Sequence, residues 1–205
     1  MHFIREYMLS DPSICDTIYD ALKNLKSKGY GAPGQTFQAA GDAGDIDPNT
    51  IKESWDIMTT DFKDLYPKGP SEIGLDVVYN EIDQIIKPQY FNDIQLYFAG
   101  RLFSYYFPHF QLYEPGQGYK VWHVDAIGAK MHRQFVFILY LNDVPDGGTK
   151  FRDYDITVEA KKGKVLFFPA NFCFVHRSEI SYTSHKAIMT GWIDCNVMSI
   201  LSGGE

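Results

Sequence analysis

Two side chains that suit a metal ion, His123 and Asp125, flank Val124 in the run YKVWHVD. The run predicts a β-strand, in which side chains two positions apart leave the same face, so the imidazole and the carboxylate can converge on one ion. The best candidate for a third ligand is His176, which ends the later run CFVH. Two histidines and one carboxylate on one face leave three adjacent coordination positions open. Such a set is typical of iron(II) sites that bind both a cosubstrate and O2.

A His-x-Asp triplet is weak by itself, because a surface histidine near an aspartate explains it equally well. Lys186, ten residues after His176, favours the metal site. If His176 ends one strand and Lys186 lies on the next, the ammonium can reach into the same barrel and pair with the distal carboxylate of a metal-bound dicarboxylate. The alternative is an exposed lysine, the usual environment of this residue type. The flanking apolar run AIMTGWI makes Lys186 less ordinary than most lysines.

The elements that must position these residues follow Phe110, where short apolar runs alternate with turns that contain Gly and Pro. This alternation of short apolar runs and turns predicts an antiparallel sandwich or barrel. The segment Arg133 to Phe151 predicts a buried strand, a turn at Pro145–Gly148 and a returning strand.

The N-terminal half predicts helices. Between Leu9 and Gly29 apolar residues recur at helical spacing, with Ser10 or Asp11 as the cap, Pro12 in the first turn and Gly29 at the end. A second helix is expected from about Leu75 to Ile86, with Pro88 after it. Residues 31–50 are rich in Gly, Pro and Asp and predict a long loop, while residues 92–107 fit either a helix or a strand. Helices first and a β-sandwich after, with no internal repeat, indicate one domain.

Composition restricts the function classes. The 205 residues suit one well-cored domain, and the net charge of −7, without a run of Lys or Arg, argues against a nucleic-acid substrate. The three cysteines are widely spaced and form no CxxC motif, so neither a disulfide framework nor a cysteine zinc site is expected. No signal peptide or membrane-spanning stretch is recognisable, and we expect a cytoplasmic protein with no membrane partner. The sequence indicates nothing about the oligomeric state.

The order and spacing of many residues after position 110 resemble the prolyl 4-hydroxylase branch of the 2-oxoglutarate/Fe(II)-dependent dioxygenase superfamily. The resemblance covers roughly residues 110–195, nearly half of the chain. The residues that carry it are Tyr113, His123, Asp125, Arg133, Tyr140, Leu141, Asn142, Gly147, Gly148, Thr149, Phe151, Gly163, Leu166, Phe168, His176, Lys186 and Trp192.

This resemblance implies an α+β, mainly β fold: a double-stranded β-helix (jelly-roll) core over about residues 108–198 with helical support over about residues 1–107, all in a single domain. It implies Fe(II) bound by His123, Asp125 and His176, with 2-oxoglutarate and O2 as cosubstrates and ascorbate as a candidate reductant. Decarboxylation of 2-oxoglutarate would yield succinate and CO2.

The resemblance also implies roles around the metal. Lys186 would hold the C5 carboxylate of 2-oxoglutarate with help from Tyr140, Tyr113 would line the pocket, Trp192 would form its wall, and Arg133 would contact a peptide substrate. Each has a plainer alternative: Tyr113, Tyr140 and Trp192 as core aromatics, Arg133 as a surface cation. Lysine at the C5-carboxylate position is typical of collagen-type and many microbial hydroxylases, whereas the oxygen-sensing animal enzymes use arginine.

The favoured substrate is a prolyl residue in a protein or peptide, with the 31–50 loop as a candidate lid. A free amino acid or another small metabolite is the alternative, and a methylated nucleobase is disfavoured by the net acidity. From other classes, a non-catalytic jelly-roll binding module and a cupin-like enzyme that uses zinc or manganese remain open. An intact triad with Lys186 argues against the former, and the His-x-Asp cluster argues against the latter.

Overall fold

The computed structural model describes residues 3–34, 51–96, 103–105 and 108–195. Its helices are α1 (Ile14–Ser27), α2 (Leu75–Glu81) and α3 (Lys87–Asp93), with a π-helical turn at Ile82–Ile86 and 3-10 turns at Thr59–Phe62, Gly69–Ile73 and Gly128–Lys130. The strands are β1 (Arg5–Met8), β2 (Ala32–Pro33), β3 (Lys52–Glu53), β4 (Trp55–Met58), β5 (Phe103–Tyr105), β6 (His109–Tyr113), β7 (Gly118–Tyr119), β8 (Arg133–Tyr140), β9 (Val144–Phe151), β10 (Ile156–Ala160), β11 (Lys164–Pro169), β12 (His176–Ser178) and β13 (Lys186–Cys195).

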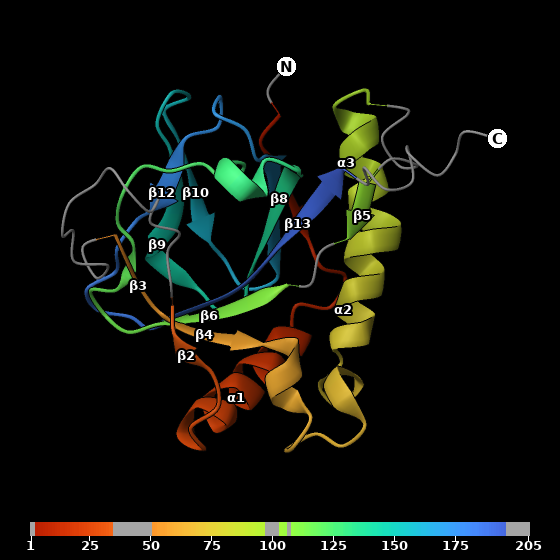
Figure 1. Ribbon diagram of the computed structural model, residues 1–205, viewed down its shortest axis with the longest axis vertical. Coiled ribbons are helices and arrows are strands. Elements are labelled where there is room, and N and C mark those ends of the chain that lie inside the picture. The colour runs from red at the N-terminus through yellow and green to blue at the C-terminus, as the bar shows by residue number, and fades with distance from the viewer. Residues whose placement is uncertain (1–2, 35–50, 97–102, 106–107, 196–205) are drawn as a thin grey trace.

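Two antiparallel sheets face each other (Figure 1). The major sheet has the strand order β1-β11-β8-β13-β6-β4-β2, with β5 also paired to β13, and the minor sheet has the order β10-β9-β12. A two-stranded ribbon of β3 and β7 lies beside them. The interior of the sandwich is filled by apolar side chains of both sheets, among them Val136 and Phe168 from the major sheet and Phe151 and Val158 from the minor one.

Both faces of the major sheet are buried, which explains the continuous apolar runs of its central strands. On β11, Val165 and Phe167 face the helices, whereas Leu166 and Phe168 face the minor sheet. The alternation follows from the two-residue period of a strand. The candidate metal site lies on the face of the major sheet toward the minor sheet, and the helices pack against the opposite face.

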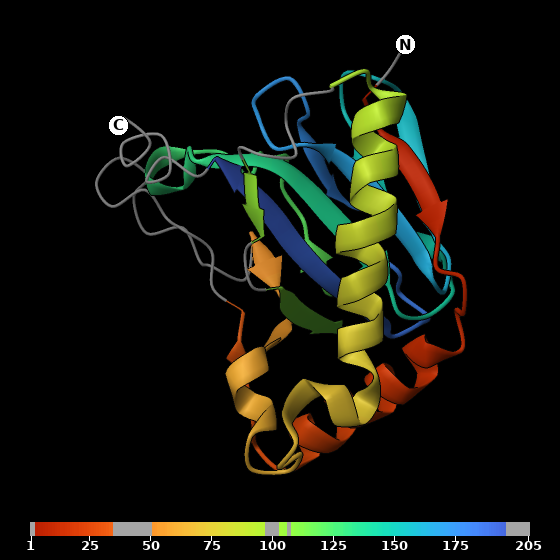
Figure 2. The same cartoon turned by 90° about the vertical axis from the view of Figure 1, so that its right-hand side faces the viewer.

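The helices cover the outer face of the major sheet (Figure 2). Helix α1 begins at Ile14 instead of near Pro12. The residues before it are held outside the helix by other hydrogen bonds: Asp11 accepts from the amide and the hydroxyl of Ser13, and the amide of Leu9 donates to the carbonyl of Gly163. Gly29 follows the helix with a positive φ of 84°, as predicted for a terminating glycine.

The second helix is longer than predicted. The helical rod continues through the π turn at Ile82–Ile86 into α3, and Pro88 lies at the start of α3 instead of beyond the helix. Inside a continuous helical rod, proline lacks the amide hydrogen for one backbone hydrogen bond and its ring crowds the preceding turn. A π turn before it gives the chain the extra residue needed to pass the proline ring.

Three sequence expectations about strands were wrong. His123 lies in an isolated bridge instead of a strand, and Asp125 follows outside any strand. His176 begins β12 instead of ending a strand. The expected turn at Pro145–Gly148 lies inside β9, and β9 pairs with β10 and β12 instead of returning along β8.

Close packing explains why β9 contains the two glycines that suggested a turn. A Cβ atom on Gly148 would lie 2.2 Å from the carbonyl oxygen of Val158 on β10, and one on Gly147 would lie 2.4 Å from a methyl group of Val144. These glycines therefore permit close packing, not chain reversal. Strand β1, which the sequence did not suggest, pairs with β11 at the edge of the major sheet.

Several expectations lie outside the described residues: most of the 31–50 loop, part of the ambiguous segment 92–107, and residues 196–198 at the end of the expected core. Within the described ranges, no helix is long and apolar enough to cross a membrane.

Candidate active site

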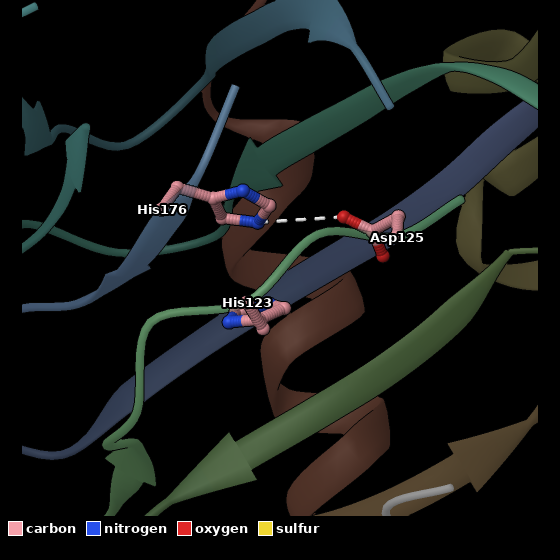
Figure 3. Close-up of side chains that lie close together, drawn as sticks. All are labelled: His123, Asp125 and His176. Carbon is pink, nitrogen blue, oxygen red and sulfur yellow. Dashed lines mark ion pairs between the residues drawn. The ribbon is translucent and has the colours of Figure 1, made fainter. Parts of the chain in front are cut away.

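Backbone pairing brings the two histidines together. The amide of each donates to the carbonyl of the other at 3.0 Å, so the chain at His123 is tied to the start of β12 at His176. Two residues later, Asp125 turns its carboxylate toward the same point (Figure 3). The candidate ligand atoms of His123, Asp125 and His176 all lie within 4.8 Å of one another, and Asp125 Oδ2 lies 3.4 Å from His176 Nε2.

Backbone carbonyls select the tautomer of both rings. His123 Nδ1 lies 3.1 Å from the carbonyl oxygen of Val121, and His176 Nδ1 lies 3.0 Å from that of Phe174. In neutral rings these contacts place the proton on Nδ1, which leaves the lone pair of Nε2 available to a metal. Burial and the neighbouring His176 lower the pKa of His123 to about 3, so that ring is neutral at physiological pH.

The Asp125 carboxylate is held by two further residues. Trp192 Nε1 donates to Asp125 Oδ1 at 2.9 Å, and Arg133 Nη1 lies 3.9 Å from the same oxygen. The guanidinium of Arg133 also stacks over the indole of Trp192, with Cζ 3.5 Å from the ring centroid. Burial by itself raises the pKa of Asp125, but the two histidines, the indole N–H and Arg133 outweigh it and hold the pKa below the usual value. Oδ1 is thereby occupied, and Oδ2 faces His176.

Aromatic rings fix the histidines in place. Tyr119 stacks on His123 with ring centroids 3.5 Å apart, and Phe168 packs edge-on against His176 at 4.8 Å. These contacts restrict both imidazoles to one orientation, which favours a preorganised site.

Lys186 is buried, with 4% of its surface exposed. Its ammonium donates to the carbonyl of Gly147 at 2.9 Å and to Ser178 Oγ at 3.3 Å. Burial lowers the pKa of Lys186 to about 8. Beside it, the Tyr140 hydroxyl donates to Thr149 Oγ1 at 2.7 Å, and the Tyr113 ring lies 5.0 Å from the ammonium.

One cavity of about 560 Å³ joins these parts, a volume within the usual range for small-molecule sites. It is lined by all eight residues that the sequence singled out: Tyr113, His123, Asp125, Arg133, Tyr140, His176, Lys186 and Trp192. Sequence reasoning missed three features: the hydrogen bond from Trp192 to Asp125, the polar contacts of Ser178 and Thr149, and Lys52 and Asp56 on the cavity wall. They depend on strand pairings that no local pattern indicates.

The donor set fits a divalent iron ion and a dicarboxylate. Two imidazole nitrogens and one carboxylate oxygen form a compact group, and the buried ammonium of Lys186 lines the same cavity. Because a buried ammonium is costly without an anion, its position favours a ligand that carries a carboxylate there.

Comparisons with known proteins agree with this geometry. Residues 108–194 match the sequence profile of the 2OG-Fe(II) oxygenase superfamily. Among curated protein sequences none matches the chain.

Three solved structures share the fold. A prolyl hydroxylase from Trichoplax adhaerens, in complex with a peptide fragment of the oxygen degradation domain of hypoxia inducible factor, has a TM-score of 0.73 at 16% identity, covering 98% of this chain and 88% of its own. A Pseudomonas putida prolyl-4-hydroxylase has a TM-score of 0.67 at 18% identity, covering 96% of this chain and 94% of its own. A viral collagen prolyl hydroxylase from Paramecium Bursaria Chlorella virus-1, in complex with 2OG, has a TM-score of 0.61 at 16% identity, covering 94% of this chain and 96% of its own.

The matched segment contains the three candidate ligands and Lys186, and over this segment, less than half of the chain, the sequence resembles the 2OG-Fe(II) oxygenase superfamily. The fold is that of the jelly-roll prolyl hydroxylases, as predicted.

Proposed function

We propose that this protein is a 2OG-Fe(II) oxygenase that hydroxylates a prolyl residue in a protein or peptide, coupled to conversion of 2-oxoglutarate to succinate and CO2. The observation that carries the proposal is a single cavity lined both by the metal-ligand group His123, Asp125 and His176 and by the buried ammonium of Lys186.

In this proposal His123 and His176 bind Fe(II) through Nε2, and Asp125 binds through Oδ2. Lys186 and Tyr140 hold the C5 carboxylate of 2-oxoglutarate, and Tyr113 lines that pocket. The bound iron supplies the oxidative chemistry on O2 and the cosubstrate. The protein's own contribution is to orient the two imidazoles and the carboxylate, and to neutralise the distal carboxylate of 2-oxoglutarate in a buried site.

Trp192 and Arg133 act in the proposal mainly as positioning residues. They occupy Asp125 Oδ1, so the carboxylate presents one oxygen instead of two. Arg133 is 6% exposed, yet it lines the cavity and can also meet a substrate near the metal.

The prolyl substrate is supported by the fold and by the likeness to the Trichoplax prolyl hydroxylase, whose structure holds a peptide fragment. A free amino acid or small metabolite is the alternative within the class. Ascorbate as reductant and a cytoplasmic location remain predictions of the same proposal.

The test is an anaerobic titration of the purified apoprotein with Fe(II) and then 2-oxoglutarate. We expect a weak visible absorption band near ~500 nm, typical of a 2-oxo acid chelated to a facial-triad iron. The band should disappear in His123→Ala and in His176→Ala and persist in His185→Ala, which removes a histidine that does not line the cavity. A folded wild-type protein that forms no band would refute the cofactor assignment.

Peptide-dependent formation of succinate then tests the substrate. Saturable turnover with prolyl peptides is expected. A screen in which no prolyl peptide is turned over, while the band forms normally, would contradict the peptide substrate and leave the cofactors intact.

A further inference from the structure

A buried polar trio on the cavity wall lies outside the metal and cosubstrate sites. Lys52 Nζ donates to Asp56 Oδ2 at 2.7 Å, and Ser54 Oγ donates to Asp56 Oδ1 at 2.6 Å. The side chains of Lys52 and Asp56 are 4% and 18% exposed, and both line the cavity. The trio is tightly built, because a Cβ atom on Gly34 would lie 2.0 Å from Ser54 Oγ.

Strand pairing places Lys52 close to the metal site. Lys52 pairs with Tyr119 across the β3–β7 ribbon, and Tyr119 stacks on His123. The trio is therefore next to the place where the substrate must approach the iron.

Strand register separates Asp56 from Tyr140. On the inner face of the major sheet Asp56 pairs with Gln111, Gln111 with Ile188, and Ile188 with Tyr140. Three strand spacings put the backbone of Asp56 about 14 Å from that of Tyr140. Asp56 therefore lies three strands from Tyr140, on the β4 side of the cavity, where its cross-strand partner Gln111 accepts a hydrogen bond from the Tyr113 hydroxyl.

Stability does not explain the ion pair. Replacing a buried ion pair by apolar residues of similar size is often neutral or stabilising, because desolvation offsets the attraction between the charges. A pair of this kind on a cavity wall is more useful for recognition. An ionised carboxylate has about four acceptor positions, and Lys52 and Ser54 use one each.

We propose that Asp56 is a specificity-determining residue that accepts a hydrogen bond from a main-chain N–H of the peptide substrate beside the target residue, while Lys52 and Ser54 hold it in position. This inference rests on the proposed peptide substrate. A neutral amide suits the site better than a cation, because Lys52 already balances Asp56 and Arg133 also lines the cavity. Proline has no N–H, so the donor comes from a flanking residue.

The test combines one substitution with one change in the peptide. The probe is an acetylated prolyl pentapeptide that the wild-type enzyme hydroxylates, compared with two analogues in which the amide N–H of the preceding or the following residue is replaced by an ester oxygen. Peptide-dependent succinate formation gives KM and kcat for wild type and for Asp56→Asn. Glu53→Gln is the matched control, because Glu53 lies on the neighbouring strand β3 but pairs with Lys120 and does not line the cavity.

We expect Asp56→Asn to raise the KM for the amide peptide about ten-fold or more, the usual loss for a hydrogen bond to a charged group. The kcat and the Fe(II)–2-oxoglutarate absorption band should stay unchanged, and so should all constants of Glu53→Gln. One ester should raise the wild-type KM by a similar factor and have little further effect in Asp56→Asn, as expected for partners in one contact.

Two outcomes would overturn the inference. If Asp56→Asn and wild type bind the amide peptide equally well, or if neither ester changes the wild-type KM, Asp56 does not recognise a main-chain N–H, and peptide hydroxylation stands. The wild-type ester comparison needs no substitution, so it decides the matter even if Asp56→Asn fails to fold. If wild type turns over no prolyl peptide at all, the proposed function fails first, and the inference falls with it.

Discussion

At the scale of single residues, one cavity holds both a metal-ligand group and a buried cation. Two imidazoles and one carboxylate form the metal-ligand group, and the ammonium of Lys186 lines the same cavity. The ammonium of Lys186 contacts carbonyl and hydroxyl oxygens but forms no ion pair closer than 4.0 Å with the described carboxylates. The resident hydrogen bonds fix its position, and a bound carboxylate would supply the missing counter-charge.

Removing this charge should weaken binding of 2-oxoglutarate. We expect Lys186→Ala to lose about 1.5–3 kcal/mol of binding free energy, which raises the 2-oxoglutarate KM at least ten-fold. Lys161→Ala, at an exposed lysine, should leave that KM unchanged. Steady-state succinate assays measure both, and an unchanged KM in Lys186→Ala would refute the role of Lys186.

The pH dependence follows from the same residue. Because the pKa of Lys186 is lowered to about 8, the ammonium of the empty site is charged below that pH and loses its proton as the pH rises through it. The 2-oxoglutarate KM of wild type, measured in steady-state assays across this range, should therefore rise above pH 8. In Lys186→Ala this rise should be absent.

At the scale of elements, β9 connects the minor sheet to the cosubstrate pocket. It supplies the Gly147 carbonyl that holds Lys186 and the Thr149 hydroxyl that accepts from Tyr140. Its partner β10 approaches so closely that a side chain at Gly148 would collide with the backbone of Val158. The position of β9 therefore determines both sheet packing and pocket geometry.

Gly148→Ala should consequently destabilise the protein by about 3 kcal/mol, the upper part of the usual cost of overpacking. It should also raise the 2-oxoglutarate KM, since β9 must shift. Gly69→Ala is the control: its φ is 77° and nothing lies within 4 Å of the added Cβ, so it should lose only about 1 kcal/mol and keep the KM. Thermal unfolding and the succinate assay measure the two effects; equal losses in both variants would contradict this account of β9.

At the scale of the whole molecule, one sheet separates two cores with different tasks. The core behind the sheet packs the helices, and the core between the sheets supports the ligands. Adjacent residues of β11 belong to different cores: Phe167 stacks on Tyr90 of α3, whereas Phe168 contacts His176. Both are fully buried.

Phe167→Leu and Phe168→Leu should therefore cost similar stability, about 1–1.5 kcal/mol each, or a few degrees in Tm for a chain of this size. Only Phe168→Leu should also weaken Fe(II) binding, because it releases the ring of His176. Thermal unfolding and Fe(II) titration of the two variants make the comparison. Equal Fe(II) affinities would show that the ligand geometry does not depend on this packing.

The class of fold and the candidate site residues could be predicted from the amino-acid sequence. The types, order and spacing of His123, Asp125, His176 and Lys186 singled them out, and the structure places them around one cavity; the short apolar runs after Phe110 predicted an antiparallel sandwich or barrel, and the fold is a sandwich. Prediction failed where a local signal has two physical causes. Gly147 and Gly148 suggested a turn although they serve close packing, and Pro88 suggested a helix end although a π turn carries the helix past it.

The surroundings of the ligands, by contrast, depend on contacts between distant parts of the chain. The contact of Trp192 with Asp125 joins residues 67 positions apart, and Lys52 meets Tyr119 across a ribbon of two short strands. Such contacts depend on strand register, which is fixed when the two faces of the major sheet are buried together. A sequence of short strands shows which side chains alternate, but not which strand lies beside which, and this choice of neighbours placed Asp56 on the wall of the cavity.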